Sequence, residues 1–133
     1  MSKKANTKNF SNLEKKIIIG TAGIGMRYGI LKKTNSIKET ALYLKKAHNY
    51  GFRYIDTSPA YGKSYLILKK TKKKFFIITK IQKEIKKKKI TFLKSILKNL
   101  INETLRNLNI TRLEGVLIQN ESIMMTKKGK VIF

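Results

Sequence analysis

The stretch from Gly51 to Gly62, with the sequence GFRYIDTSPAYG, decides how the chain folds. A short apolar run ends in Asp56, the only aspartate of the protein, and the turn after it carries the only proline and then Tyr61. Burying an unpaired carboxylate would be costly, so a partner for Asp56 is expected nearby. The stretch predicts a buried strand that delivers a polar side chain at its end.

Similar apolar runs alternate with helical segments along the chain. The predicted strands cover residues 17–19, 52–56, 75–80 and 116–118, and the predicted helices cover residues 37–50, 64–71 and 91–108, with the basic residues 83–89 as a linker. The apolar side expected for the second helix is formed by Tyr65, Leu66 and Leu68. The stripe expected for the third helix consists of Leu93, Ile96, Leu97, Leu100, Ile101, Thr104 and Leu108. Ser36 and Glu39 form a capping box before the first helix, and Gly51 provides its stop. Near-continuous β-branched strands are typical of a sheet buried on both faces. The alternation predicts an α/β fold with a parallel sheet and helical crossovers.

Polar side chains follow three successive predicted strands, namely Asp56, Lys80 and Gln119. In parallel α/β folds, ligands bind at the carboxyl ends of the strands. A tyrosine is a weak acid at neutral pH, but a neighbouring ammonium stabilises its phenolate, and a carboxylate can hold that ammonium in place. Asp56, Tyr61 and Lys80 are therefore a candidate general-acid site. The alternative interpretation is a structural ion pair between Asp56 and Lys80.

The glycines at 20, 23 and 25 do not have the spacing of a dinucleotide-binding turn. In that motif the helix begins at once and an acidic residue follows about 20 residues later. Here residues 26–35 separate the glycines from the first predicted helix. Glycines of this kind more often let a loop pack closely at the mouth of a sheet.

Composition limits the class of protein. The chain has 133 residues, enough for one domain, whereas a full eight-stranded α/β barrel needs about 250. The formal charge is +24, with 27 lysines against 4 arginines, and this charge attracts nucleic acid or anionic membrane non-specifically. A solvated lysine surface is the favoured interpretation, because specific phosphate recognition favours arginine. The absence of cysteine excludes disulfides and thiolate sites, and no secretory signal or bilayer-spanning segment is recognised, so a cytoplasmic protein is expected.

Three segments together resemble the N-terminal half of the aldo-keto reductases. They are the glycine loop GTAGIGMRYGI at residues 20–30, the Gly51–Gly62 stretch, and the strand end IITK at residues 77–80. The resemblance implies that Asp56 orients and balances charge, that Tyr61 donates a proton, and that Lys80 makes that proton easier to lose. It also implies NADPH or NADH as the cofactor, with Gly20 and Thr21 as weak candidates for cofactor binding.

The chain departs from the family pattern at two positions, of which only the first belongs to the expected site. Gln119 stands where the family has a histidine at the end of the fourth strand, and it can donate a hydrogen bond but cannot titrate. Tyr65 stands where the family usually has a glutamate. The single histidine, His48, is expected to be a helix-terminal cation or a spectator rather than a substitute for the missing one.

The resemblance implies a partial (β/α)8 barrel of about four to five strands. Residues 1–16 are expected to form a basic tail and residues 17–133 the N-terminal half of the barrel, with residues 127–133 resembling the start of a fifth strand. Since the family holds its cofactor mainly with its second half, we expect little activity from this chain alone. The expected ligand is a small carbonyl substrate. The alternatives are a half barrel that associates with itself or with a second half-barrel chain, and a basic nucleic-acid-binding module.

Overall fold

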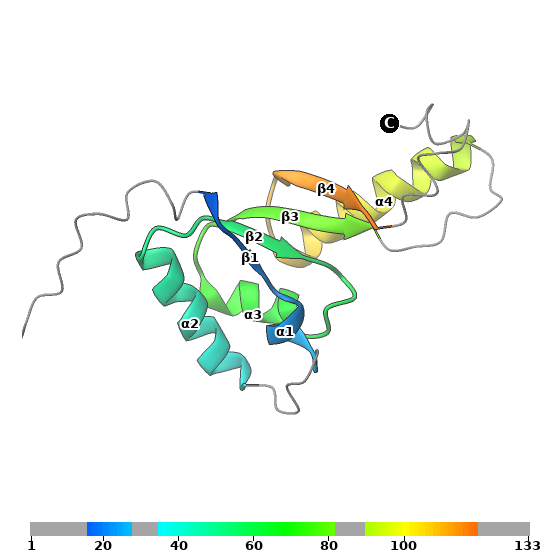
Figure 1. Cartoon of the computed structure of the whole chain (residues 1–133). Coiled ribbons are helices and arrows are strands. Elements are labelled where there is room, and N and C mark those ends of the chain that lie inside the picture. The colour runs from blue at the N-terminus through cyan, green and yellow to red at the C-terminus, as the bar shows by residue number, and fades with distance from the viewer. Residues whose placement is uncertain (1–15, 28–34, 82–89, 120–133) are drawn as a thin grey trace, which may run out of the picture.

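The computed structural model describes residues 16–27, 35–81 and 90–119. The elements are β1 (Ile18–Gly20), α1 (Ala22–Gly25), α2 (Ile37–Asn49), β2 (Tyr54–Thr57), α3 (Ser64–Thr71), β3 (Phe76–Ile81), α4 (Ile90–Leu108) and β4 (Gly115–Ile118). All strand pairs are parallel, and the sheet order is β1-β2-β3-β4 (Figure 1). The predicted α/β fold with helical crossovers is confirmed, as an open sheet that corresponds to part of a barrel. Since each strand lies beside the next one in sequence, the sheet has no point at which the strand order reverses.

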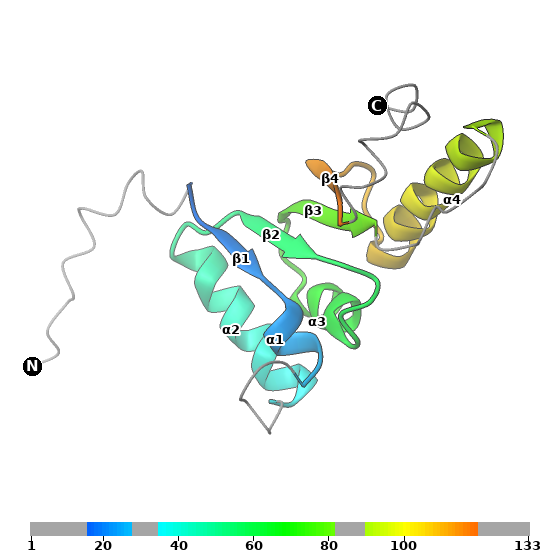
Figure 2. The ribbon, with the colours of Figure 1, turned by 45° about the vertical axis from the view of Figure 1, so that its right-hand side comes forward.

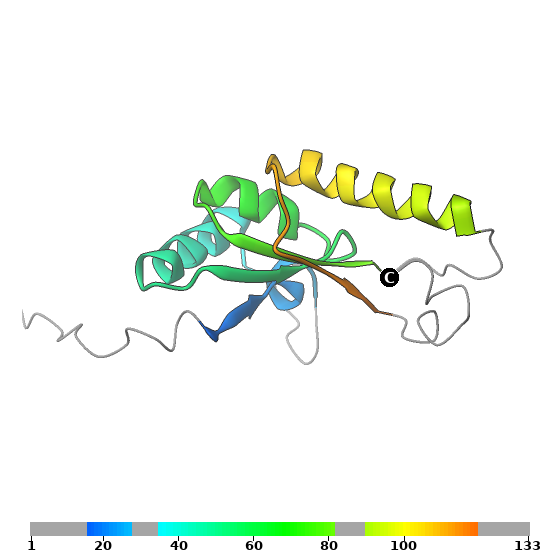
Figure 3. The same ribbon diagram turned by 90° about the horizontal axis from the view of Figure 1, so that it is seen from above.

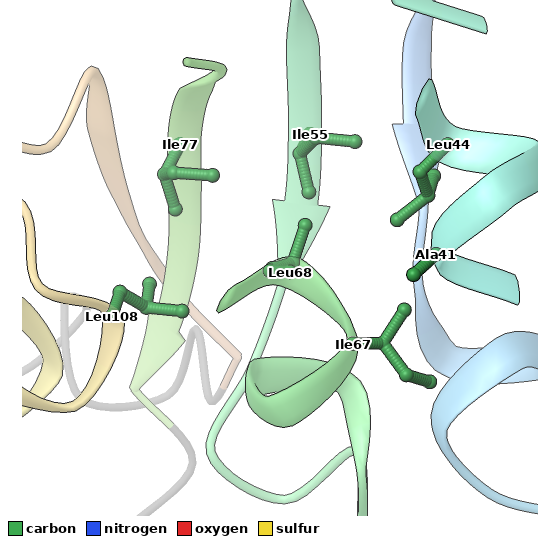
Figure 4. Packing of buried hydrophobic residues seen from close by; sticks show 7 residues of the cluster. All are labelled: Ala41, Leu44, Ile55, Ile67, Leu68, Ile77 and Leu108. Atoms are coloured by element: carbon green, nitrogen blue, oxygen red, sulfur yellow. The ribbon is translucent and has the colours of Figure 1, made fainter. Parts of the chain in front are cut away.

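One face of the sheet is covered by helices. Seen from above, α2, α3 and α4 all lie on the same side of the strands (Figure 3), and α3 packs against both α2 and α4. Apolar side chains from the helices meet those of β2 and β3 there (Figure 4). This buried cluster consists of Ala41, Leu44, Ile55, Ile67, Leu68, Ile77 and Leu108. It is the core that holds the described part of the chain together.

The helices α2, α3 and α4 leave the other face of the sheet uncovered (Figure 2). We call this the bare face. Ile18, Phe76 and Leu117 point to this side and are 49%, 44% and 47% exposed. The prediction of a sheet buried on both faces is therefore wrong for the described residues. The physical reason is that successive parallel crossovers of the same hand place their helices on the same side of the sheet.

The helix predictions are confirmed at most positions. Ser36 and Glu39 form the predicted capping box, with both hydrogen bonds present, and Gly51 has a φ of 104° directly after α2. The apolar side predicted for α3 is partly wrong, because Leu66 is 57% exposed while Ile67 is buried. Ser64 and Thr71 share the buried side of α3, so hydroxyl groups occupy positions that a hydrophobic count assigns to solvent. The short helix α1 was not predicted.

Some predicted segments lie outside the described residues. These are residues 1–15 of the basic tail, the lysine-rich linker at 83–89 and the fifth-strand segment at 127–133. None of the helices in the described ranges combines the length and the apolar character that a bilayer crossing requires.

Candidate active site

The strand register places Asp56 and Lys80 on the bare face of the sheet. Asp56 pairs with Gly20 on one side and with Ile78 on the other, and Lys80 lies two residues beyond Ile78 along β3. Side chains two residues apart on a strand point to the same face, so Lys80 is diagonally adjacent to Asp56. Both residues lie toward the carboxyl ends of their strands, as the sequence predicts.

Lys80 joins the two other residues of the predicted constellation. Its Nζ lies 2.6 Å from Asp56 Oδ2 and 3.1 Å from the phenolic oxygen of Tyr61. The Asp56 and Lys80 side chains are 25% and 23% exposed, so the ion pair is only partly shielded from water. The structure thus brings together the three residues that the sequence analysis selected, with the ammonium between the carboxylate and the phenol.

The hydrogen bond that Lys80 donates to the Asp56 carboxylate raises the pKa of Lys80 above its ordinary value of 10.5. The hydrogen bond to Tyr61 also raises this pKa, while burial lowers it. Lys80 is therefore a cation throughout the neutral range. Asp56 Oδ1 is buried and has no hydrogen-bond partner within the described residues. A buried carboxylate oxygen without a partner carries a desolvation cost, which the ion pair made by the other oxygen of Asp56 helps to offset.

A tight turn holds Tyr61 above the sheet. The Tyr61 amide donates to the Ser58 carbonyl at 3.0 Å, and the Tyr61 carbonyl accepts from the Ser64 amide at 3.0 Å. The fully buried Ser58 hydroxyl accepts a further bond from the Ala60 amide at 3.3 Å. The Tyr61 backbone is therefore fixed by bonds on both sides, which connects the end of β2 to the start of α3.

Two glycines, Gly25 and Gly62, allow the turn that carries Tyr61 to pack closely against α1. The Gly25 carbonyl accepts a 2.8 Å bond from the Lys63 amide, and a Cβ added at Gly25 would overlap the Tyr61 carbonyl oxygen. Gly62 has a φ of +54°, and a Cβ there would overlap the Gly25 carbonyl oxygen. The first turn after β1 therefore packs backbone against backbone on the turn that carries Tyr61. This close approach gives the glycine-rich loop a packing function, which is the interpretation that the sequence analysis favoured.

A layer of buried hydroxyl groups lies beside the site. The single proton of the Thr21 hydroxyl has two acceptors within reach, Thr57 Oγ1 at 2.8 Å and the Asp56 carbonyl at 3.0 Å, and Thr57 Oγ1 donates to Ser64 Oγ at 3.2 Å. All three side chains are fully buried. Sequence reasoning missed this layer, although the hydroxyl residues that flank Asp56 and follow Tyr61 were a usable signal.

The remaining predicted site residues differ in where they lie. Gly20 is exposed on the bare face beside Asp56, and a Cβ there would meet nothing within 4 Å. Thr21 is fully buried, and its hydroxyl is already engaged with Thr57. Gln119 directly follows β4, is exposed, and makes no hydrogen bond to Asp56, Tyr61 or Lys80 in the described part of the chain. The assigned roles of these three residues stay predictions.

His48 and Tyr65 lie away from the Lys80 ammonium. His48, near the end of α2, contacts the Lys74 carbonyl through Nε2 at 3.1 Å and packs edge-on against Phe75. Burial, assisted by the charge of Arg53, lowers its pKa, so His48 is neutral at physiological pH rather than the helix-terminal cation considered from the sequence. The Tyr65 hydroxyl lies 3.3 Å from Thr79 Oγ1 on the helix-covered side. Within the described ranges, no group of three or more histidine or acidic side chains is arranged to hold a metal ion.

A sequence profile of the Aldo/keto reductase family matches residues 16–121. The structure is similar to those of two proteins from Pseudomonas aeruginosa assigned to the aldo-keto reductases. For the first, the identity is 22% and the TM-score 0.62, with 86% of this chain and 47% of that chain covered. For the second, the identity is 24% and the TM-score 0.61, with 83% of this chain and 44% of that chain covered. At these identities, the likeness to the two proteins shows the fold.

A third similar structure is that of a thermostable aldo-keto reductase in complex with the inhibitor epalrestat. It is 26% identical with a TM-score of 0.54, and the match covers 76% of this chain and 37% of that chain. A search of curated proteins gave no match. The chain therefore corresponds to less than half the length of each of these three solved structures.

Proposed function

The chain belongs to the aldo/keto reductase family, and from this premise we propose that Asp56, Tyr61 and Lys80 form a proton-transfer site for the reduction of an aldehyde or ketone with NADPH or NADH. The observation that carries the proposal is the position of the Lys80 ammonium, 2.6 Å from the Asp56 carboxylate and 3.1 Å from the Tyr61 phenol. A structural ion pair alone gives no reason for the phenol to be in contact with the ammonium.

The direction of the hydrogen bonds supports Tyr61 as the proton donor. An ammonium group has three donors and no acceptor, so the Tyr61 oxygen must accept from Lys80. Its own proton is then free to point away from Lys80, toward the carbonyl oxygen of a substrate. As negative charge develops on that oxygen, Tyr61 donates its proton and the resulting phenolate is stabilised by the adjacent ammonium. Asp56 keeps Lys80 in place and balances its charge.

Gly20 supports a place for the flat part of a nicotinamide cofactor in this proposal. It lies beside Asp56 on the bare face, and no described residue comes within 4 Å of where its Cβ would be. We assign Gly20 as the residue over which the ring would lie, while the buried Thr21 supports the site from below through its bonds to Asp56 and Thr57. When bound, the cofactor supplies the hydride for reduction of the substrate.

We expect weak turnover from the chain alone, because the site lies on the bare face. The side chains of Asp56 and Lys80 are 25% and 23% exposed, so water has access to the ion pair. Electrostatic stabilisation is stronger where water is excluded. A further half barrel over this face, from the same polypeptide or from another chain, would shield the site and raise the rate.

The experiment compares Tyr61→Phe with Tyr65→Phe, a control that removes a phenolic oxygen outside the site. NADPH oxidation is followed with a series of aldehydes and ketones, and the dependence of the rate on protein concentration is measured. Tyr61→Phe should lower kcat by about 10²–10⁴-fold, and Tyr65→Phe should keep the wild-type rate. Equal rates for the two variants, or no NADPH-dependent turnover by the wild type, would overturn the proposal.

A further inference from the structure

The end of the sheet opposite to Asp56 and Lys80 contains a cavity of about 790 Å³. It lies where α3 leads into β3 and where α4 leads into β4. In a parallel sheet, these two connections enter neighbouring strands at the same end, so they face each other across the β3–β4 pair. The cavity is of the size that small-molecule ligands occupy in proteins.

The lining of the cavity is strongly basic. Four lysines, Lys69, Lys72, Lys73 and Lys74, come from the α3 side, and Arg112 comes from the α4 side. The single acidic residue of the lining, Glu114, is already paired with Arg112 at 2.9 Å. None of the four lysine ammonium groups has an ion-pair partner within the described residues. The four lysines therefore concentrate positive charge that no described residue neutralises, which favours an anionic ligand.

The floor of the same cavity is apolar. Leu68, Leu108 and Ile77 are buried there, and the partly buried Phe75 also lines it. Phe76 borders the cavity as well, but its side chain points to the bare face of the sheet. An aromatic and aliphatic floor under a cationic rim suits a ligand that combines a planar apolar group with phosphate, since bases stack on aromatic side chains while lysine binds phosphate as a point charge.

Backbone bonds hold both walls of the cavity in place. The Lys74 carbonyl lies 3.1 Å from His48 Nε2, and the Phe76 amide donates to the Arg53 carbonyl at 2.8 Å. On the other wall, the Glu114 amide donates to the Ile77 carbonyl at 2.7 Å. The cavity is therefore formed before a ligand arrives, which reduces the entropic cost of binding.

We propose that this basic cavity is a nucleotide-binding site that is separate from the proton-transfer site at the other end of the sheet. The lysines and Arg112 would bind the phosphates, and the apolar floor would receive the base. The nucleotide could come from free solution or from a single strand of nucleic acid, since both present the same chemistry. A competing explanation is that these lysines only compensate the negative end of the α3 dipole.

The experiment measures the binding of three probes by titration calorimetry: ADP, inorganic pyrophosphate and a short oligodeoxythymidylate. The probes are tested on the wild type, on the double variant Lys72→Gln with Lys74→Gln, and on the double variant Lys45→Gln with Lys46→Gln. The second pair lies on the exposed side of α2 outside the cavity and removes the same charge. All four lysines are exposed, so both variants should fold, which thermal unfolding checks.

We expect the cavity variant to bind ADP at least about tenfold more weakly than the wild type, and the control variant to bind it within about twofold. ADP should also bind more tightly than pyrophosphate, because only ADP reaches the apolar floor. A selective loss of oligonucleotide binding with weak ADP binding would identify a strand as the source of the nucleotide. Equal losses in the two variants, or ADP binding no tighter than pyrophosphate, would overturn the proposal. Since Tyr61→Phe leaves the cavity intact, failure of the reductase proposal would leave this result unchanged.

Discussion

The two faces of the sheet carry side chains of the same apolar types but in opposite environments. On the covered face, Ile55 and Ile77 are 0% and 5% exposed beneath α2, α3 and α4. On the bare face, Ile18 and Phe76 are 49% and 44% exposed. The covered face holds the described part together, while the bare face presents Asp56 and Lys80. The site therefore lies on the less protected side of the sheet.

The largest expected effect is the loss of an isoleucine from the covered face. Ile55→Ala should lower the free energy of unfolding by about 2–5 kcal/mol, because it removes apolar contacts and leaves a cavity in a fully buried region. The same substitution on the bare face, Ile18→Ala, should cost less than about half of that, since Ile18 is 49% exposed. Urea unfolding of both variants measures the difference. Equal losses would mean that the bare face is buried in solution.

The next effect concerns the contact between α1 and the Tyr61 turn. Gly25→Ala should lower the free energy of unfolding by about 1–3 kcal/mol, because the new methyl group overlaps the Tyr61 carbonyl oxygen and the backbone must move. Gly23→Ala is the control, because a Cβ there meets nothing within 4 Å and alanine favours the helix. Thermal unfolding and NADPH-dependent turnover are both measured, and Gly25→Ala should lower both. If Gly25→Ala changed neither the unfolding temperature nor the turnover, the close contact between Gly25 and the Tyr61 turn would be contradicted.

A smaller effect is expected from the ion pair of the bare face. At neutral pH, Lys80→Met should lower the free energy of unfolding by about 1 kcal/mol, because the pair is partly exposed and screened by water. The pKa of Lys80 is raised above 10.5 in the folded protein, so the stabilisation is present below about pH 10.5 and is lost as the pH rises through the folded value. Urea unfolding at several pH values measures this. A difference between variant and wild type that grows at alkaline pH would contradict the assignment.

Substitution of Phe76 should have the smallest effect on the free energy of unfolding. It should nevertheless change the association of the protein with itself. Apolar faces left open to water favour association, so we expect the wild type to self-associate or to bind a second half barrel through the bare face. Phe76→Ser should reduce the mass measured by light scattering over a range of protein concentrations. The free energy of unfolding should change by no more than about 1 kcal/mol. Leu66→Ser, on the exposed side of α3, is the control and should leave the measured mass unchanged. A mass that is the same for the wild type and both variants would argue against association through the bare face.

The sequence predicted the elements well where local signals were strong. The capping box at Ser36 and the stop at Gly51 marked the bounds of α2, and the helical stripe of α4 correctly included Leu97, Thr104 and Leu108. It was less successful on α3, where Leu66 is exposed and Ser64 is buried. Hydrophobicity alone could not show this, because Ser64 is buried with its hydroxyl paired to that of Thr57, a residue seven positions earlier on another element.

For the candidate site, the sequence by itself determined the chemistry that is available. It identified Asp56, Tyr61 and Lys80, and the parallel order of the strands implied that they would meet at one end of the sheet. Only the tertiary structure decided that Lys80 lies between the other two and that the ion pair faces the bare side. It also decided that, among the described residues, Gln119 makes no hydrogen bond to any of the three. The physical reason is that strand register, crossover hand and backbone contacts such as that of Gly25 with Tyr61 join residues far apart in the chain, and local sequence patterns do not encode these distances.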